Sequence, residues 1–115
     1  MSNMLENQAA IAENLSEVAM SPEAITREMS AIVREAAEPG YAGESVKAAI
    51  RRAAFRLALS YRRAKSYWYG DVKLVPAHEA DRLRKAKRQI LRDRASRLNS
   101  ELEILQLRLQ HLDND

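Results

Sequence analysis

Apolar side chains recur every three or four residues along most of the chain, the spacing that places them on one face of an α-helix. Pro39, Gly40 and Gly43 interrupt this pattern, Gly70 interrupts it again, and Pro76 stands where a last helix begins. Ser21 is the expected N-cap of a helix over residues 22–37, and Pro22 follows it in the first turn. The pattern predicts helices over residues 4–19, 22–37, 46–57, 61–69 and 77–112.

The last helix has a second regularity in its C-terminal half. Steps of four and three residues form an a/d heptad seam made of Leu91, Ala95, Leu98, Leu102, Leu105, Leu109 and Leu112. Ile104 and Leu107 lie outside the seam and widen the apolar face. The seam predicts self-association as a coiled coil or a larger bundle. The alternatives are that this helix folds back onto its own domain or packs against the helix over residues 4–19.

Charge is segregated along the chain in a way that the net value of +3 conceals. Residues 1–46 hold two basic and eight acidic residues, residues 47–97 hold sixteen basic and four acidic, and residues 98–115 hold one basic and four acidic. A basic block of this kind suits a polyanion, because neutralising phosphates releases counterions. The alternative is a basic surface that is simply solvated.

Residues 53–70 meet the requirements of two helices joined by a tight turn. Ala54 is small enough for the crossing of the helices, Ala58 and Leu59 suit the turn, and Ala64 and Tyr67 are the expected inward positions of the second helix. This stretch of about twenty residues resembles the helix-turn-helix of phage repressor and Cro-like regulators, in which a Leu-Gly-Leu-Ser type turn leads into the recognition helix. Ala58 departs from the family, which usually has glycine there.

The resemblance implies that residues 61–69 enter the major groove of DNA. The expected base contacts are Tyr61, Arg62, Lys65, Ser66 and Tyr69. The expected phosphate contacts are Lys47, Arg51, Arg52, Arg56, Ser60, Arg63 and Lys73, with Ser60 also the N-cap. The basic part of the last helix is expected beside the DNA backbone. Tyr67 and Trp68 are interpreted as core residues, and stacking on unpaired bases is the alternative.

Little in the composition points to catalysis. There is no cysteine, and the two histidines, His78 and His111, lack metal-ligand spacing. Gly40 and Gly43 have the spacing of a KH-domain clamp, but neither basic residues nor strands accompany them. We therefore expect no enzyme, cofactor or metal. Since no signal peptide or membrane span fits the sequence, we expect a cytoplasmic, nucleoid-associated protein.

Together these features predict an all-α fold in three parts: an acidic N-terminal helical arm (1–38), a helix-turn-helix core (44–75) and a long oligomerisation helix (76–115). The expected function is sequence-specific binding of double-stranded DNA by a dimer or higher oligomer, as a bacterial transcriptional regulator of phage or plasmid type. The acidic helices are a further surface for a protein partner. Two alternatives are a phage DNA-packaging recognition subunit, resembling a small terminase, and a protein-interaction module such as an antiactivator.

Overall fold

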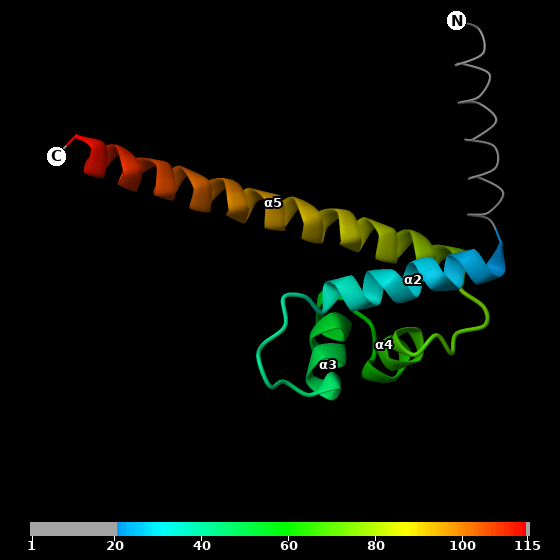
Figure 1. Cartoon of the computed structure of the whole chain (residues 1–115). Coiled ribbons are helices and arrows are strands. Elements are labelled where there is room, and N and C mark those ends of the chain that lie inside the picture. The colour runs from blue at the N-terminus through cyan, green and yellow to red at the C-terminus, as the bar shows by residue number, and fades with distance from the viewer. Residues whose placement is uncertain (1–20, 115) are drawn as a thin grey trace, which may run out of the picture.

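The computed structural model describes residues 21–114, and within them the fold is all-α (Figure 1). The four described helices are α2 (Pro22–Ala36), α3 (Val46–Leu57), α4 (Tyr61–Trp68) and α5 (Ala77–Asp113). Each lies within one residue of the bounds that periodicity predicts. The helix expected over residues 4–19 lies outside the described part of the chain.

Serine side chains fix where the three shorter helices begin. The Oγ atoms of Ser21, Ser45 and Ser60 accept hydrogen bonds, each 3.1 Å long, from the backbone N–H groups three residues further on. These bonds satisfy donors that have no partner inside the helix. The expected caps at Ser21 and Ser60 are therefore confirmed.

One hydrophobic core joins all four helices. Met29, Ile32, Val33 and Ala36 of α2 pack with the apolar faces of α3 and α4 and with the first turns of α5. The fully buried side chains of largest volume are Tyr67, Met29, Ile32, Ile50, Leu57, Leu83 and Val33. Residues 1–38 were expected to form an arm apart from the helix-turn-helix, but α2 lies inside the same core, because its apolar face completes that of α3 and α4.

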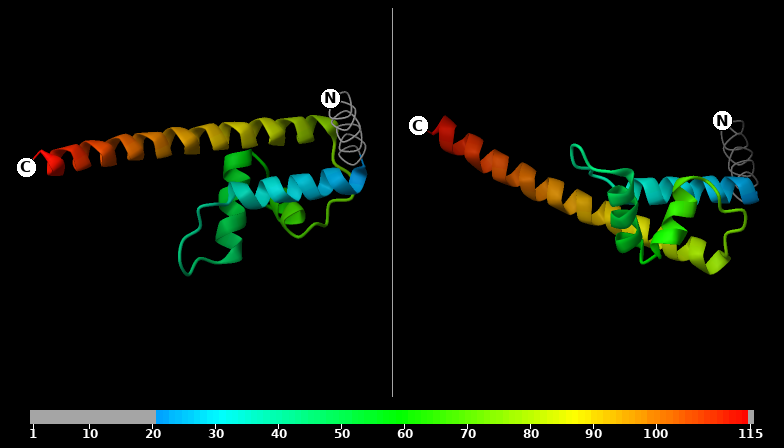
Figure 2. Two further views of the ribbon diagram at one scale, coloured as in Figure 1. Left: turned by 45° about the horizontal axis from the view of Figure 1, so that its top comes forward. Right: turned by 90° about the horizontal axis from the view of Figure 1, so that it is seen from below.

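The long helix α5 has two distinct halves (Figures 1 and 2). Ala80 and Leu83 are buried, and Ala86 and Ile90 are partly buried against the core. Beyond Arg94 every described side chain is exposed, and the helix extends well past the body. The C-terminal half therefore does not fold back onto residues 21–90. Within residues 21–114, no helix is both long and apolar enough to cross a membrane.

The packing of α2 on α5 brings together charges that are far apart in the sequence. Glu28 accepts hydrogen bonds of 2.9 Å from Nε of Arg84 at both carboxylate oxygens, and Glu35 lies 3.6 Å from Nζ of Lys87. The acidic N-terminal block thus partly neutralises the basic block on this side of the molecule. The basic surface available to a polyanion is smaller than the sequence suggests.

Candidate nucleic-acid interface

The turn between α3 and α4 is closed by a left-handed residue. Ala58 has φ 54° and ψ 42°, the conformation that glycine usually adopts at this point of a helix-turn-helix. The N–H of Leu59 donates to the carbonyl of Ala54 (2.9 Å) and the N–H of Ala58 to that of Phe55 (3.3 Å), the two bonds of a Schellman cap. From α5, Arg82 donates to the Ala58 carbonyl (3.1 Å). Hydrogen bonds from within the turn and from α5 therefore hold this backbone conformation, although position 58 is alanine and not glycine.

Replacing Ala58 by glycine is expected to stabilise the protein by about 1 kcal/mol, because the left-handed conformation strains an L-residue and not glycine. The side chain of Ala58 is exposed, so little packing is lost. Urea unfolding followed by circular dichroism measures the change. Ala58→Val is the matched control and should destabilise, since a β-branched residue tolerates this backbone least.

Two side chains on the inward face of α4 anchor the helix to the core. Ala64 and Tyr67 are completely buried, and they lie three residues apart on the face toward α2 and α3. The expectation that these are the inward positions of the second helix is confirmed. Tyr67 is unavailable for stacking on a nucleic-acid base.

The outer face of α4 carries the polar groups that sequence reasoning assigned to base contacts. Arg62 and Lys65 are exposed, and Ser66, half-buried, donates from Oγ to the Arg62 carbonyl (3.0 Å). Tyr69 follows the last turn and is 55% exposed. Helical geometry places these four residues opposite Ala64. Neither Arg62 nor Lys65 has an ion-pair partner among residues 21–114.

The same surface continues onto α3. Lys47 and Arg51 are exposed and one turn apart, and the Arg51 guanidinium lies 5.9 Å from the ring centroid of Tyr61 at the start of α4. Phe55, one turn further along α3, is 88% exposed. Phe55 is not among the residues that the sequence predicted for this surface.

A polar cluster beneath α4 ties the helix to the start of α5. Arg63 donates to a carboxylate oxygen of Glu79 (2.9 Å) and to the Tyr67 hydroxyl (3.3 Å), and the Tyr67 hydroxyl donates to the same carboxylate oxygen. Burial, reinforced by the Glu79 charge, raises the pKa of Tyr67 to about 12. Burial also opposes ionisation of Glu79, but hydrogen bonds from Tyr67 and Arg63 outweigh it and lower that pKa. Arg63 thus connects α4 to the start of α5, and its Nε and one Nη are engaged inside the protein.

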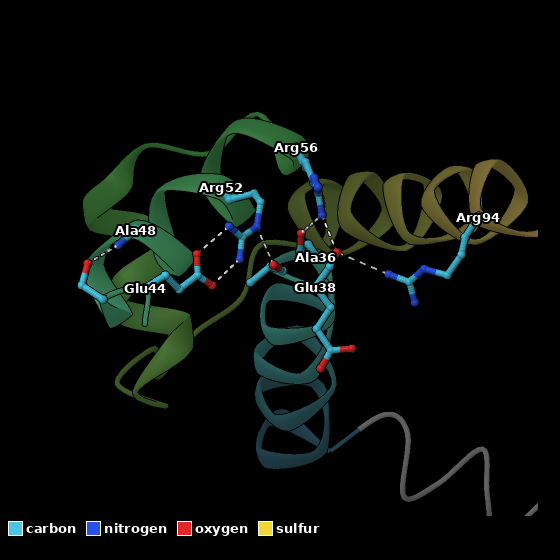
Figure 3. Close-up of polar contacts among 9 residues, drawn as sticks. Ala36, Glu38, Glu44, Ala48, Arg52, Arg56 and Arg94 are labelled. Carbon is cyan, nitrogen blue, oxygen red and sulfur yellow. Dashed lines mark hydrogen bonds and ion pairs between the residues drawn. The ribbon is translucent and has the colours of Figure 1, made fainter. Parts of the chain in front are cut away.

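Two more arginines expected at phosphates have internal partners (Figure 3). Arg52 pairs with both carboxylate oxygens of Glu44 (2.8 and 2.6 Å) and donates from Nε to the Ala37 carbonyl (2.6 Å). Arg56 donates to the carbonyls of Ala36 (2.9 Å) and Glu38. Sequence spacing could not reveal these bonds, because their acceptors are mainly the backbone oxygens at the end of α2.

Trp68 serves a similar anchoring role at the other end of α4. The guanidinium of Arg34, on α2, lies 4.6 Å from the Trp68 ring centroid and donates to the Trp68 carbonyl (2.7 Å). A cation stacked on the indole face stabilises the contact between the helices. Trp68 is partly buried against the core, in agreement with its interpretation as a packing residue.

The basic half of α5 borders an open groove beside the turn. The groove has a volume of about 890 Å³, and its basic lining residues are Arg56, Arg82, Lys85, Arg92, Arg94 and Arg97. Glu38 and Asp93 also line it, so its charge is mixed. Lys73, the last of the expected phosphate contacts, lies exposed in the segment between α4 and α5.

Among residues 21–114, no group of three or more His, Cys, Asp or Glu side chains is arranged to hold a metal ion. Basic residues accessible for a polyanion remain on the outer face of α4, on the adjoining face of α3 and along α5, where Arg82, Lys85, Arg88, Arg92 and Arg97 are exposed. No protein-family model, curated protein sequence or solved structure matches this chain.

Proposed function

We propose that this protein binds double-stranded DNA sequence-specifically, with α4 as the recognition helix in the major groove. The observation that carries the proposal is the outer face of α4, where Arg62 and Lys65 project side by side from a helix fixed by its buried face. Arginine and lysine donors match the O6 and N7 acceptors of guanine. Ser66 and Tyr69 lie on the same face for further base contacts.

The phosphate contacts in this proposal come from a smaller set than the sequence suggested. Lys47, Arg51 and Lys73 are exposed and flank α4, and Ser60 caps its N-terminus, where a helix end favours an anion. Arg52, Arg56 and Arg63 are occupied by internal carboxylates and carbonyls. Their role in the proposal is to hold α2, α3, α4 and α5 in the orientation that the outer face requires.

Within this proposal the protein acts as a transcriptional regulator in the bacterial cytoplasm. Two copies joined through α5 would present two recognition helices, and the second contact would then benefit from a high effective concentration. The same features suit a DNA-packaging recognition subunit, which differs in its stoichiometry and in having a single genomic target. A protein-interaction module would lack affinity for duplex DNA.

Titration of the full chain with a fluorescent random duplex tests the proposal. Between 50 and 200 mM salt, we expect affinity to fall roughly 10²–10³-fold, because about four or five phosphates are neutralised. Absence of binding at 50 mM would contradict the proposal. Sequencing of the genomic DNA that the protein retains then distinguishes a regulator from a packaging subunit. Clustered palindromic sites support a regulator, whereas one site supports packaging.

A further inference from the structure

The C-terminal half of α5 presents an apolar seam that no described part of the chain covers. Four consecutive seam leucines, at positions 98, 102, 105 and 109, are between 53% and 59% exposed. A regular row of such residues over three heptads is unfavourable in water and is typical of a helix that pairs with another. The question that the sequence left open is which helix covers it, and in which direction.

We propose that two copies of this chain pair through residues 92–113 of α5 in antiparallel orientation. In the register that we assign, Leu102 packs against the partner's Leu105, and Leu98 packs against the partner's Leu109. Ala95 then lies opposite the partner's Leu112, at each end of the paired segment. A small residue opposite a large one fills the space between the helices evenly.

The charges that flank the seam select this orientation and this register. Antiparallel pairing brings Glu101 beside the partner's Arg108 and Arg92 beside the partner's Asp113, and symmetry repeats both pairs. Asn99 and Gln106, two further flanking residues, are neutral and face each other. All four flanking contacts between charged residues of the described helix are therefore attractive.

Shifting the antiparallel register by one heptad in either direction loses these contacts. One shift places Glu101 opposite the partner's Glu101 and Arg94 opposite the partner's Arg108. The other shift places Arg108 opposite the partner's Arg108. Like charges at these positions repel, so each shift replaces attraction with repulsion.

A parallel pair is disfavoured by the basic half of the helix. If it continued toward the helix start, it would set Arg88 of both copies in the seam. Only the contact between Arg108 and the partner's Asp113 would be attractive. The antiparallel arrangement instead lays the acidic end of each helix along the basic stretch of the other.

The packed body of the protein, formed by α2, α3, α4 and the first turns of α5, leaves room for the partner where α5 extends beyond it. An open groove of about 430 Å³ lies there, lined by Glu38, Pro39, Arg94, Arg97, Leu98 and Glu101. The end of the partner's helix would lie beside this groove. With a rise of 1.5 Å per residue, the two bodies would be roughly 55 Å apart along the paired helices.

This pairing does not rest on the proposed DNA binding, and it is measured without DNA. Sedimentation equilibrium at 50 mM salt compares the full chain with Glu101→Arg, Arg108→Glu and the double swap. Each single change should weaken the pair about tenfold, because it turns two attractive contacts into repulsive ones. The double swap should restore the affinity. Both residues are exposed in the single chain, so the fold is not at risk.

In a parallel pair, Arg108→Glu would face the partner's Asp113 whether or not Glu101 is also changed, so failure of the double swap to recover would overturn the proposal. A monomer at all concentrations would also overturn it and would leave the predicted helix over residues 4–19 as the alternative occupant of the seam.

Disulfide formation gives the orientation directly, since the chain has no cysteine of its own. Leu98→Cys and Leu109→Cys should each fail to form cross-linked dimers alone but should form them when the two variants are mixed. Cross-linking of each variant with itself would show a parallel pair and would sink the proposal. Leu107→Cys, which points away from the seam, is the control and should form no cross-link in either orientation.

Discussion

Replacing Tyr67 by alanine is expected to remove about 3–5 kcal/mol of stability, a large part of the roughly 5–15 kcal/mol that holds a domain of this size together. The ring is completely buried at the centre of the core that joins all four described helices, so its loss leaves a cavity. It also strips Glu79 and Arg63 of a shared partner. Thermal unfolding followed by circular dichroism measures the effect.

Tyr67→Phe separates packing from hydrogen bonding at the same position. It keeps the ring and removes only the hydroxyl, so we expect a loss of about 1–2 kcal/mol. If Tyr67 instead stacked on nucleic-acid bases, alanine would impair binding while leaving the melting temperature nearly unchanged. That outcome would contradict the structural role given to Tyr67.

The two variants also differ from the parent protein in pH dependence. The pKa of Tyr67 is raised to about 12 in the folded protein. Its contribution to stability is therefore complete below about pH 10 and is lost as pH rises toward 12, because the unfolded phenol ionises first. Glu79 behaves oppositely: its pKa is lowered, so its contribution is present above the ordinary carboxyl range and lost in acid. In Tyr67→Phe, we expect the alkaline loss to be absent and the acid loss to be smaller.

Removing Arg62 and Lys65 together is expected to have the largest effect on DNA binding. Each base contact of this kind discriminates by about 1–3 kcal/mol, so the double alanine variant should lose at least roughly thirtyfold in affinity for the cognate site. Affinity for random DNA should fall much less. Fluorescence anisotropy with cognate and random duplexes at one salt concentration measures both values.

A matched control must remove the same charge from elsewhere on the molecule. Arg27 on α2 and Arg88 on α5 are both exposed, and neither lies on the outer face of α4 or on the adjoining face of α3. Their double alanine variant should lower cognate and random binding to a similar, small extent. Equal behaviour of the two double variants would refute α4 as the recognition helix, since net charge alone would then explain the binding.

Local features of the sequence were enough to place the described helices. Apolar spacing, the three capping serines and the Gly and Pro breaks act within a few residues, and each helix lies within one residue of its expected bounds. The inward positions Ala64 and Tyr67 followed from the same spacing. The sequence placed Ala58 in the turn, but alanine does not by itself favour the left-handed conformation that the residue adopts there.

The assignment of arginines depended on contacts that local spacing does not contain. Arg52, Arg56 and Arg63 resemble Arg62 in sequence. Apart from the Tyr67 hydroxyl beside Arg63, their partners are backbone carbonyls or single carboxylates that lie 8 to 20 residues away. Lys87 and Arg84 similarly meet acidic residues of α2 more than 50 positions earlier. A basic residue therefore cannot be assigned to a DNA surface until the internal acceptors around it are known.

The sequence by itself determined the all-α fold, the turn, the buried face of α4 and the heptad seam of α5, because each is set by periodicity or by a residue acting on its own neighbours. Only the tertiary structure decided that α2 belongs to the shared core and which arginines remain exposed. It also decided that the seam extends past the packed helices, so that no described part of the chain covers it. These depend on which surfaces meet when the helices pack, and the burial and charge pairing that result are properties of the assembled faces rather than of any one segment.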